Sequence, residues 1–215
     1  MTITIREPGS ALTHLAGVIL AAAAAIPMLI KATMSGRMEE IAAMSVFMGS
    51  MLMLYTASTV YHSLNVKGGI LKALRKLDHM MIFVLIAGSY TPVCMLSLEQ
   101  KKGRMLLLAI WGLALTGMAF KAFWITCPKW LSSIIYIGMG WTCVFVFGDL
   151  LEVLSAGAFG WLLAGGIIYT AGGLVYALKI PLFSAKKYFG NHELFHLFVL
   201  GGSICHFICM FCYLV

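Results

Sequence analysis

Charged side chains are scarce in this sequence of 215 residues. Lysine and arginine contribute 15 residues and aspartate and glutamate only 8, so that charged residues make up 11% of the chain. A soluble domain carries about 25% charged residues. Hydrophobic residues make up 61% of the sequence, and a single small core cannot bury that much apolar surface. The composition therefore excludes a soluble globular protein and indicates a protein whose surface faces lipid.

Three other patterns are missing. The six cysteines lack the paired spacing of a zinc ribbon or a secreted disulfide framework, so we expect small apolar side chains there. The net charge of +7 comes without a basic face interleaved with aromatics, which makes nucleic acid an unexpected partner. Residues 1–10 are polar and the apolar run after them is longer than the h-region of a signal peptide, so no cleavable leader is predicted.

Seven apolar runs are each long enough to cross a hydrocarbon core of about 30 Å, which takes roughly 20 helical residues. They lie near residues 11–30, 41–63, 77–98, 105–125, 131–150, 157–178 and 192–215. The runs lack the period-two alternation of barrel strands, and the connectors between them are short. We therefore predict an all-α membrane protein with one domain over residues 1–215, a seven-transmembrane helix bundle in the plasma or inner membrane of the cell.

The basic residues between the runs predict the orientation, because short cytoplasmic loops retain positive charge. If the N-terminus is cytoplasmic, the inner segments hold ten lysines and arginines and the outer segments hold five. The inner ten are Arg6, Lys67, Lys72, Arg75, Lys76, Lys121, Lys129, Lys179, Lys186 and Lys187, and the outer five are Lys31, Arg37, Lys101, Lys102 and Arg104. This bias predicts a cytoplasmic N-terminus and a C-terminus outside.

Polar residues cluster where three of the predicted spans meet the cytoplasmic side. The second span ends with Ser58 and His62, the third opens with Asp78, and the last begins with His192 and His196. The two histidines of the last span, four residues apart, lie on one helix face at roughly 6 Å. Ionisable residues within spans are costly and mark functional sites. We therefore expect these five side chains to share one membrane level.

The residue types at this level suit a zinc ion. Three neutral imidazoles, from His62, His192 and His196, can hold Zn²⁺ and leave a fourth tetrahedral position for water or substrate. Asp78 is placed to hold and deprotonate a zinc-bound water. Ser58 lies one turn before His62, where it can orient a ligand or donate a hydrogen bond to an oxyanion.

The remaining histidines have less definite roles. His79 follows Asp78 and points about 100° away from it, which favours a supporting or interfacial position. His206 lies ten residues beyond His196, about 15 Å deeper, and is predicted to be a buried polar contact. His14, at the inner end of the first span, fits either the site or the interface.

The motif set Ser58-x-x-x-His62, Asp78 and His192-x-x-x-His196 resembles the three motifs of the progestin and adipoQ receptor (PAQR) family. The small size of the chain is similar to the bacterial haemolysin-III branch of that family, and the resemblance covers nearly all of the chain. It implies zinc held by the three histidines, with Asp78 on the zinc-bound water and Ser58 beside them. It also implies slow hydrolysis of lipid amides such as ceramide and a role in membrane lipid homeostasis.

The leading functional prediction is a zinc-dependent hydrolase of lipid amides or esters, with inner-leaflet membrane lipids as its partners. One alternative is an intramembrane metalloprotease, because His192-Glu193-x-x-His196 matches the H-E-x-x-H pattern with Glu193 as base. Against this alternative, Glu193 points about 100° away from His192 on a helix. The other alternative is a membrane sensor or haemolysin-type pore with structural zinc, which would have protein rather than water in the fourth coordination position.

Overall fold

The computed structural model describes residues 5–178 and 189–215. In this part of the chain every regular element is helical, and seven helical segments are long and apolar enough to cross a membrane. Five of them are α1 (Pro8–Met34), α2 (Met38–Ser63), α3 (Gly68–Leu96), α4 (Gln100–Phe123) and α7 (Ala156–Leu178). The prediction of an all-α, multi-pass membrane protein is confirmed.

The other two spans change helix type along their length. The fifth consists of α5 (Lys129–Gly140), a 3₁₀ segment (Trp141–Val146) and α6 (Phe147–Val153). The last is α8 (Asn191–Cys209), which continues as a π-helical turn over Met210–Leu214. The sequence prediction placed both spans correctly but expected continuous helices.

The break in the fifth span coincides with an inserted side chain from α3. The Tyr90 hydroxyl donates a hydrogen bond to the Gly140 carbonyl at 2.6 Å and accepts one from the Cys143 amide at 2.8 Å. A side chain that takes both a donor and an acceptor from a helix interrupts its ladder of backbone hydrogen bonds. Tyr90 therefore accounts for the change from α5 to the 3₁₀ segment.

The third span starts nine residues earlier than predicted, at Gly68 rather than near residue 77. Gly68 has a φ of +63°, a conformation that glycine adopts readily, and it separates α3 from the preceding connector. The early turns carry Lys72, Arg75 and Lys76. These charged residues lower the hydropathy of the segment, so the apolar length of the sequence does not mark it as part of the span. The expectation that Asp78 opens the span is thus wrong: Asp78 lies about three turns into α3.

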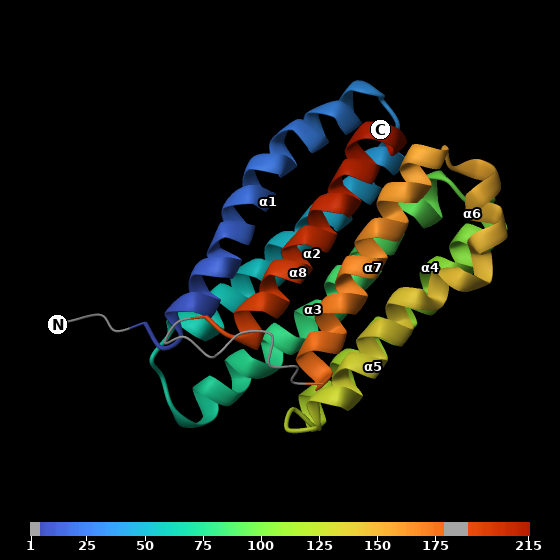
Figure 1. Cartoon of the computed structure of the whole chain (residues 1–215). Coiled ribbons are helices and arrows are strands. Elements are labelled where there is room, and N and C mark those ends of the chain that lie inside the picture. Colours follow the sequence, from blue (N-terminus) through green and yellow to red (C-terminus); the bar gives the residue numbers. More distant parts are fainter. Residues whose placement is uncertain (1–4, 179–188) are drawn as a thin grey trace.

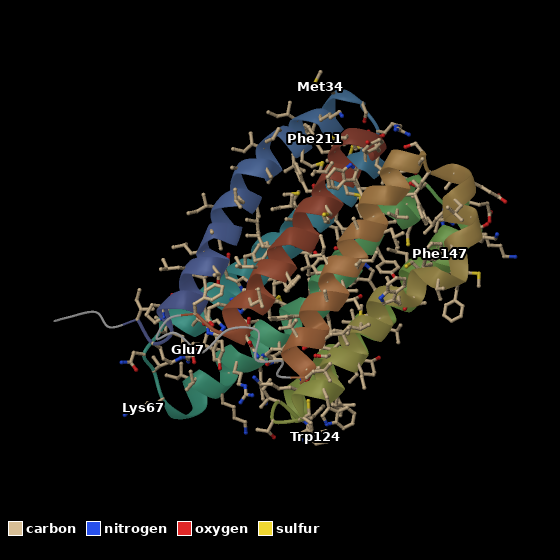
Figure 2. The ribbon with its side chains drawn as sticks, viewed as in Figure 1. Glu7, Met34, Lys67, Trp124, Phe147 and Phe211 are labelled. Atoms are coloured by element: carbon tan, nitrogen blue, oxygen red, sulfur yellow. The ribbon has the colours of Figure 1, made fainter. Side chains whose placement is uncertain are left out.

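The helices lie roughly side by side, and α1 begins at the end of the bundle opposite to the one where the last span ends (Figure 1). Glu7, Lys67 and Trp124 mark one end, while Met34 and Phe211 mark the other (Figure 2). The last helix, α8, packs against both α7 and α1, so the first and last spans are neighbours. The orientation of the bundle in the membrane stays a prediction. Three of the basic residues on which it rests, Lys179, Lys186 and Lys187, lie outside the described residues.

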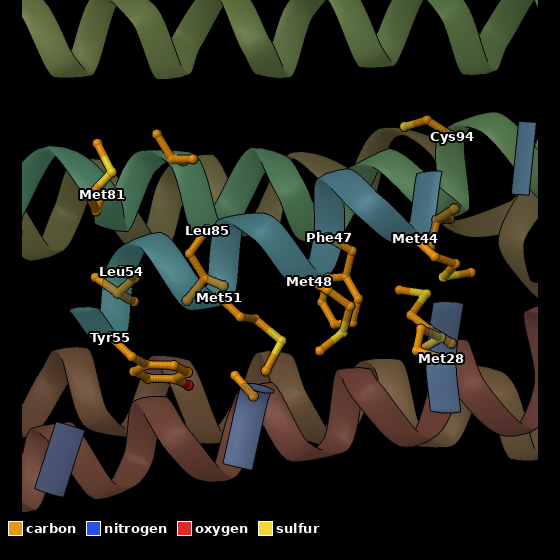
Figure 3. Close-up of a cluster of buried hydrophobic side chains, with 14 of the residues drawn as sticks. Met28, Met44, Phe47, Met48, Met51, Leu54, Tyr55, Met81, Leu85 and Cys94 are labelled. Carbon is orange, nitrogen blue, oxygen red and sulfur yellow. The ribbon is translucent and has the colours of Figure 1, made fainter. Parts of the chain in front are cut away.

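A methionine-rich core holds α1, α2 and α3 together (Figure 3). Met28 of α1 and Met44 of α2 are fully buried, and Met81 of α3 belongs to the same cluster. Unbranched thioether side chains fill irregular gaps between helices. On the outer face of α1, by contrast, Leu12 and Ile19 are 59% and 61% exposed, as expected for side chains that face lipid.

Two tyrosines fix α8 between α2 and α7. The Tyr55 hydroxyl donates to the Ser203 hydroxyl at 2.6 Å, and the Tyr169 hydroxyl lies 2.8 Å from the same oxygen. Gly202 allows the close approach, because a Cβ atom there would lie 2.7 Å from the Tyr169 ring. These contacts set the position of α8, whose first turns carry the histidine pair.

Candidate metal centre

The three predicted ligand histidines come together at one end of the bundle. His62 lies in the last turn of α2, and His192 and His196 lie in the first turns of α8. One ring nitrogen from each lies within 4.8 Å of the others. The Nε2 atoms of His62 and His192 are 3.2 Å apart, and the rings of His192 and His196 are 4.4 Å apart between centroids. The histidines therefore form a compact group with the spacing of a metal site.

His62 is oriented by a carboxylate that sequence reasoning missed. Its Nδ1 lies 2.5 Å from Oε2 of Glu7, just before α1. This hydrogen bond, helped by Arg6, holds the pKa of Glu7 at about 2 although partial burial acts in the opposite direction. The ionised carboxylate only accepts hydrogen bonds, so Nδ1 of His62 carries the proton and its Nε2 offers a lone pair to the cluster.

His196 is oriented in the same way by Thr13 of α1, 3.0 Å from its Nδ1. The single hydroxyl proton of Thr13 is directed at backbone carbonyls, those of Ser10 at 2.9 Å and Gly9 at 3.1 Å. The Thr13 oxygen must therefore accept from the imidazole, which places the proton on Nδ1 and a lone pair on Nε2 of His196. Outer partners of this kind set the tautomer of metal-binding histidines.

The third histidine leaves one ring nitrogen unused. Nδ1 of His192 is buried and has no hydrogen-bond partner among the described residues. With the lone pairs of His62 and His196 directed inward, the cluster offers neutral imidazole nitrogens to a cation, which is the donor set that Zn²⁺ favours. The residues present thus fit a divalent metal ion.

Asp78 and Ser58 are both buried, and of the two only Asp78 is among the described residues that line the cavity. Asp78 lines a cavity together with His192 and His196, and its Oδ2 is 3.4 Å from Nδ1 of His79. The His79 ring also contacts the Arg75 carbonyl at 2.9 Å, in keeping with its predicted supporting position. Ser58 is fully buried, and its hydroxyl has no hydrogen-bond partner in the described part of the chain.

His14, left open by the sequence, lies at the centre of this region. Its ring stacks on that of His196 with centroids 3.6 Å apart and planes 12° from parallel. Both of its ring nitrogens are buried, and neither has a partner among the described residues. His14 is also one of the residues that line the cavity, as Asp78 is.

Glu193 has a local role in the helix terminus. One carboxylate oxygen accepts a hydrogen bond from the Ser10 hydroxyl at 2.5 Å. The other accepts from the backbone amide of Gly190 at 2.9 Å and so completes a capping interaction at the start of α8. Both oxygens are engaged, and Glu193 is absent from the described lining of the cavity.

A cavity of about 160 Å³ runs from the histidine cluster toward the other end of the bundle. Its lining comes mainly from α3, the fifth span, α7 and α8, and includes His206. Its lining is mainly apolar, with Leu85, Phe159, Leu162 and Val199 among the residues. An elongated apolar group can therefore lie in the cavity with its polar end at the histidines.

Comparison with known proteins agrees with this architecture. The family model described as "Haemolysin-III related" matches residues 3–207. The protein named Hemolysin-3 from Bacillus cereus is 37% identical over all of this chain and 95% of its own length, and the Hemolysin-3 homolog of Bacillus subtilis (strain 168) is 38% identical over 99% and 96%. Progestin and adipoQ receptor-like protein 1 from Caenorhabditis elegans is 25% identical over 94% of this chain and 50% of its own length.

Proposed function

This chain belongs to the haemolysin-III related family, and from that premise and its histidine cluster we propose that it is a zinc-dependent hydrolase of membrane lipid amides or esters. The observation that carries the proposal is the junction between the cluster and the apolar cavity. His192 and His196 line the same cavity as a set of apolar side chains from five spans. A lipid that enters with its acyl chain in the cavity has its head group at the histidines.

The proposed zinc ligands are His62, His192 and His196. When bound, zinc supplies a nucleophilic water at neutral pH and polarises a carbonyl oxygen as a Lewis acid. Glu7 and Thr13 keep the imidazoles of His62 and His196 in the tautomer that presents Nε2. The outer contacts thus prepare the ligand nitrogens before a metal arrives.

The other polar groups have roles that follow from their chemistry. Asp78 is buried beside the cluster, where its carboxylate takes a proton from the attacking water and orients it. The unpaired hydroxyl of Ser58 donates a hydrogen bond to the oxygen that becomes negative as the carbonyl is attacked. The buried surroundings strengthen both interactions, because water is excluded.

The metalloprotease alternative has less support. It requires Glu193 as the base, yet both oxygens of this carboxylate are engaged, by Ser10 and by the Gly190 amide. The cavity also has the lining expected for an apolar chain rather than for a polar peptide backbone. The name of the Bacillus cereus relative, Hemolysin-3, keeps a pore or lytic activity as the second candidate. In that case zinc would only hold α2, α3 and α8 together.

The proposal is tested by lipid turnover in proteoliposomes. Purified protein is assayed against a panel of ceramides and phospholipids, before and after metal removal by dipicolinate and after zinc is restored. We expect hydrolysis that disappears with the metal and returns with zinc, while the matched variant Cys205→Ala, outside the site, behaves as wild type. Zinc-loaded wild-type protein that hydrolyses none of these lipids, or turnover unaffected by metal removal, would contradict the proposal.

A further inference from the structure

His206 lines the cavity well away from the histidine cluster. It is ten residues beyond His196 on α8, a rise of roughly 15 Å. The residue is 9% exposed, and it lines both the main cavity and an adjoining one of about 70 Å³. The proposed hydrolytic chemistry does not use this imidazole.

The His206 ring is held in one orientation. A Cβ atom at Gly165 of α7 would lie 2.3 Å from Cδ2 and 2.6 Å from Nε2, so that edge of the ring packs directly against α7. The Tyr169 ring contacts it edge-on, with centroids 5.3 Å apart. Because Nδ1 is on the opposite side of an imidazole from Cδ2, this nitrogen points away from Gly165.

The hydrogen bonding of His206 defines which nitrogen carries the proton. Nε2 lies 3.3 Å from the Leu162 carbonyl oxygen, which only accepts, so Nε2 is the donor. Nδ1 is therefore an acceptor, and it is buried without a partner among the described residues. An unpaired buried acceptor costs about 1–3 kcal/mol. The partner that is missing has to be a hydrogen-bond donor.

Two polar residues that line the adjoining cavity together with His206, Ser89 and Tyr90, already have hydrogen-bond partners. Ser89 donates to the Leu85 carbonyl at 2.8 Å, and the Tyr90 hydroxyl bridges Gly140 and Cys143. A buried water usually makes 2–4 hydrogen bonds and needs only about 10–15 Å³ of such a cavity. The space of about 160 Å³ is larger than that and mainly apolar, so a donor attached to an apolar chain fits it better than an isolated water does.

We propose that the cavity binds a lipid acyl chain that carries a hydroxyl group well down its length, and that this hydroxyl donates a hydrogen bond to Nδ1 of His206. The inference rests on the proposed function only in taking a lipid chain as the occupant. His206 then determines specificity: it favours a hydroxylated chain over an unsubstituted one, and also over a keto chain, which has no proton to donate.

Binding of three fatty acids tests this inference without any catalytic readout. Octadecanoic acid, 12-hydroxyoctadecanoic acid and 12-ketooctadecanoic acid are competed against radiolabelled octadecanoic acid on the full chain in detergent. Ratios between ligands are compared across variants, so that partition into micelles cancels. We expect wild-type protein to bind the hydroxy acid about threefold to tenfold more tightly than the keto acid, the range for one net hydrogen bond.

Three variants make the result specific. His206→Leu should bring the hydroxy-to-keto ratio to about one while still binding octadecanoic acid, which shows that the cavity is intact. His206→Asn, whose side-chain oxygen can replace Nδ1 as acceptor, should restore part of the preference. Cys205→Ala, the adjacent residue, should keep the wild-type ratio.

A wild-type ratio near one, a preference that survives His206→Leu, or failure of the wild-type protein to bind any of the three acids would overturn the inference. Its failure is distinguishable from that of the hydrolase proposal. His62→Ala is expected to lose hydrolysis and to keep the hydroxyl preference. A preference found in protein that hydrolyses no lipid would refute the hydrolase and leave the role of His206 in place.

Discussion

The imidazole of His14 stacks on that of His196, with the ring centroids 3.6 Å apart and the planes only 12° from parallel. Neither nitrogen of His14 has a partner in the described part of the chain, although both are buried. The stack fixes one face of His196, whose Nδ1 is bound by Thr13. It also places two unpaired nitrogens where the cavity reaches the cluster.

The variant His14→Phe separates stacking from proton chemistry. Phenylalanine keeps an aromatic ring against His196 but has no nitrogen, so we expect zinc content close to that of wild type. Lipid turnover should fall by about 100-fold if His14 exchanges a proton with the substrate, at the low end of general acid–base contributions. The measurements are zinc by mass spectrometry and turnover in proteoliposomes. If lipid turnover in this variant equals that of wild type, His14 contributes only its packing against His196.

Zinc content should depend on the histidine cluster and not on the more distant histidine. We expect one Zn²⁺ per chain in wild-type protein, loss of the metal in His62→Ala and His196→Ala, and its retention in His206→Ala. The reason is geometric: one nitrogen each of His62, His192 and His196 lies within 4.8 Å of the others, and His206 is roughly 15 Å away along α8. Equal metal loss in all three variants would refute this assignment.

Asp78→Asn distinguishes a catalytic carboxylate from a structural ligand. The amide is nearly the same size but cannot take a proton, so we expect hydrolysis to be abolished while zinc and the melting temperature are retained. A change outside the ligands typically costs 10–100-fold in metal affinity, which saturating zinc compensates. Loss of both metal and thermal stability would instead make Asp78 a direct ligand in a closed structural site. Wild-type turnover in this variant would exclude it from the reaction.

Thr13→Val tests the outer support of His196. Valine fills nearly the same space but removes the oxygen that accepts from Nδ1, so the imidazole loses the contact that sets its tautomer. We expect zinc affinity to fall about 10–100-fold, as measured by competition with a chelating dye. Thr116→Val, on an exposed part of α4 where the hydroxyl bonds only to its own helix, serves as the matched control. Equal affinities in the two variants would show that Thr13 does not support the site.

The predicted orientation is tested with fusions at the C-terminus. The ten-to-five bias of basic residues places the N-terminus in the cytoplasm and Val215 outside. A phosphatase fused after Val215 should therefore be active, since it folds only outside the cytoplasm, and a fluorescent protein at the same point should stay dark. The opposite pair of results would invert the orientation and place the histidine cluster at the outer face.

Much of this architecture follows from the sequence because lipid imposes simple rules. Apolar length alone located the seven spans, and the spacing of His192 and His196 with the shared level of His62 predicted the cluster. The contacts of Glu7 with His62 and of Thr13 with His196 join residues 55 and 183 positions apart, and no local pattern marks such pairs. The 3₁₀ segment in the fifth span could not be predicted, because it depends on Tyr90, which lies on another helix. The start of α3 was missed because its first turns are charged and have low hydropathy.

The contact between the first and last spans has a consequence for biosynthesis. Ser10 and Thr13 of α1 leave the ribosome 183 residues before their hydrogen-bond partners on α8. A nascent chain with six inserted spans has His62 and Glu7, but it lacks His192 and His196, the other two histidines of the cluster. The three histidines therefore come together only once α8 has been inserted beside α1.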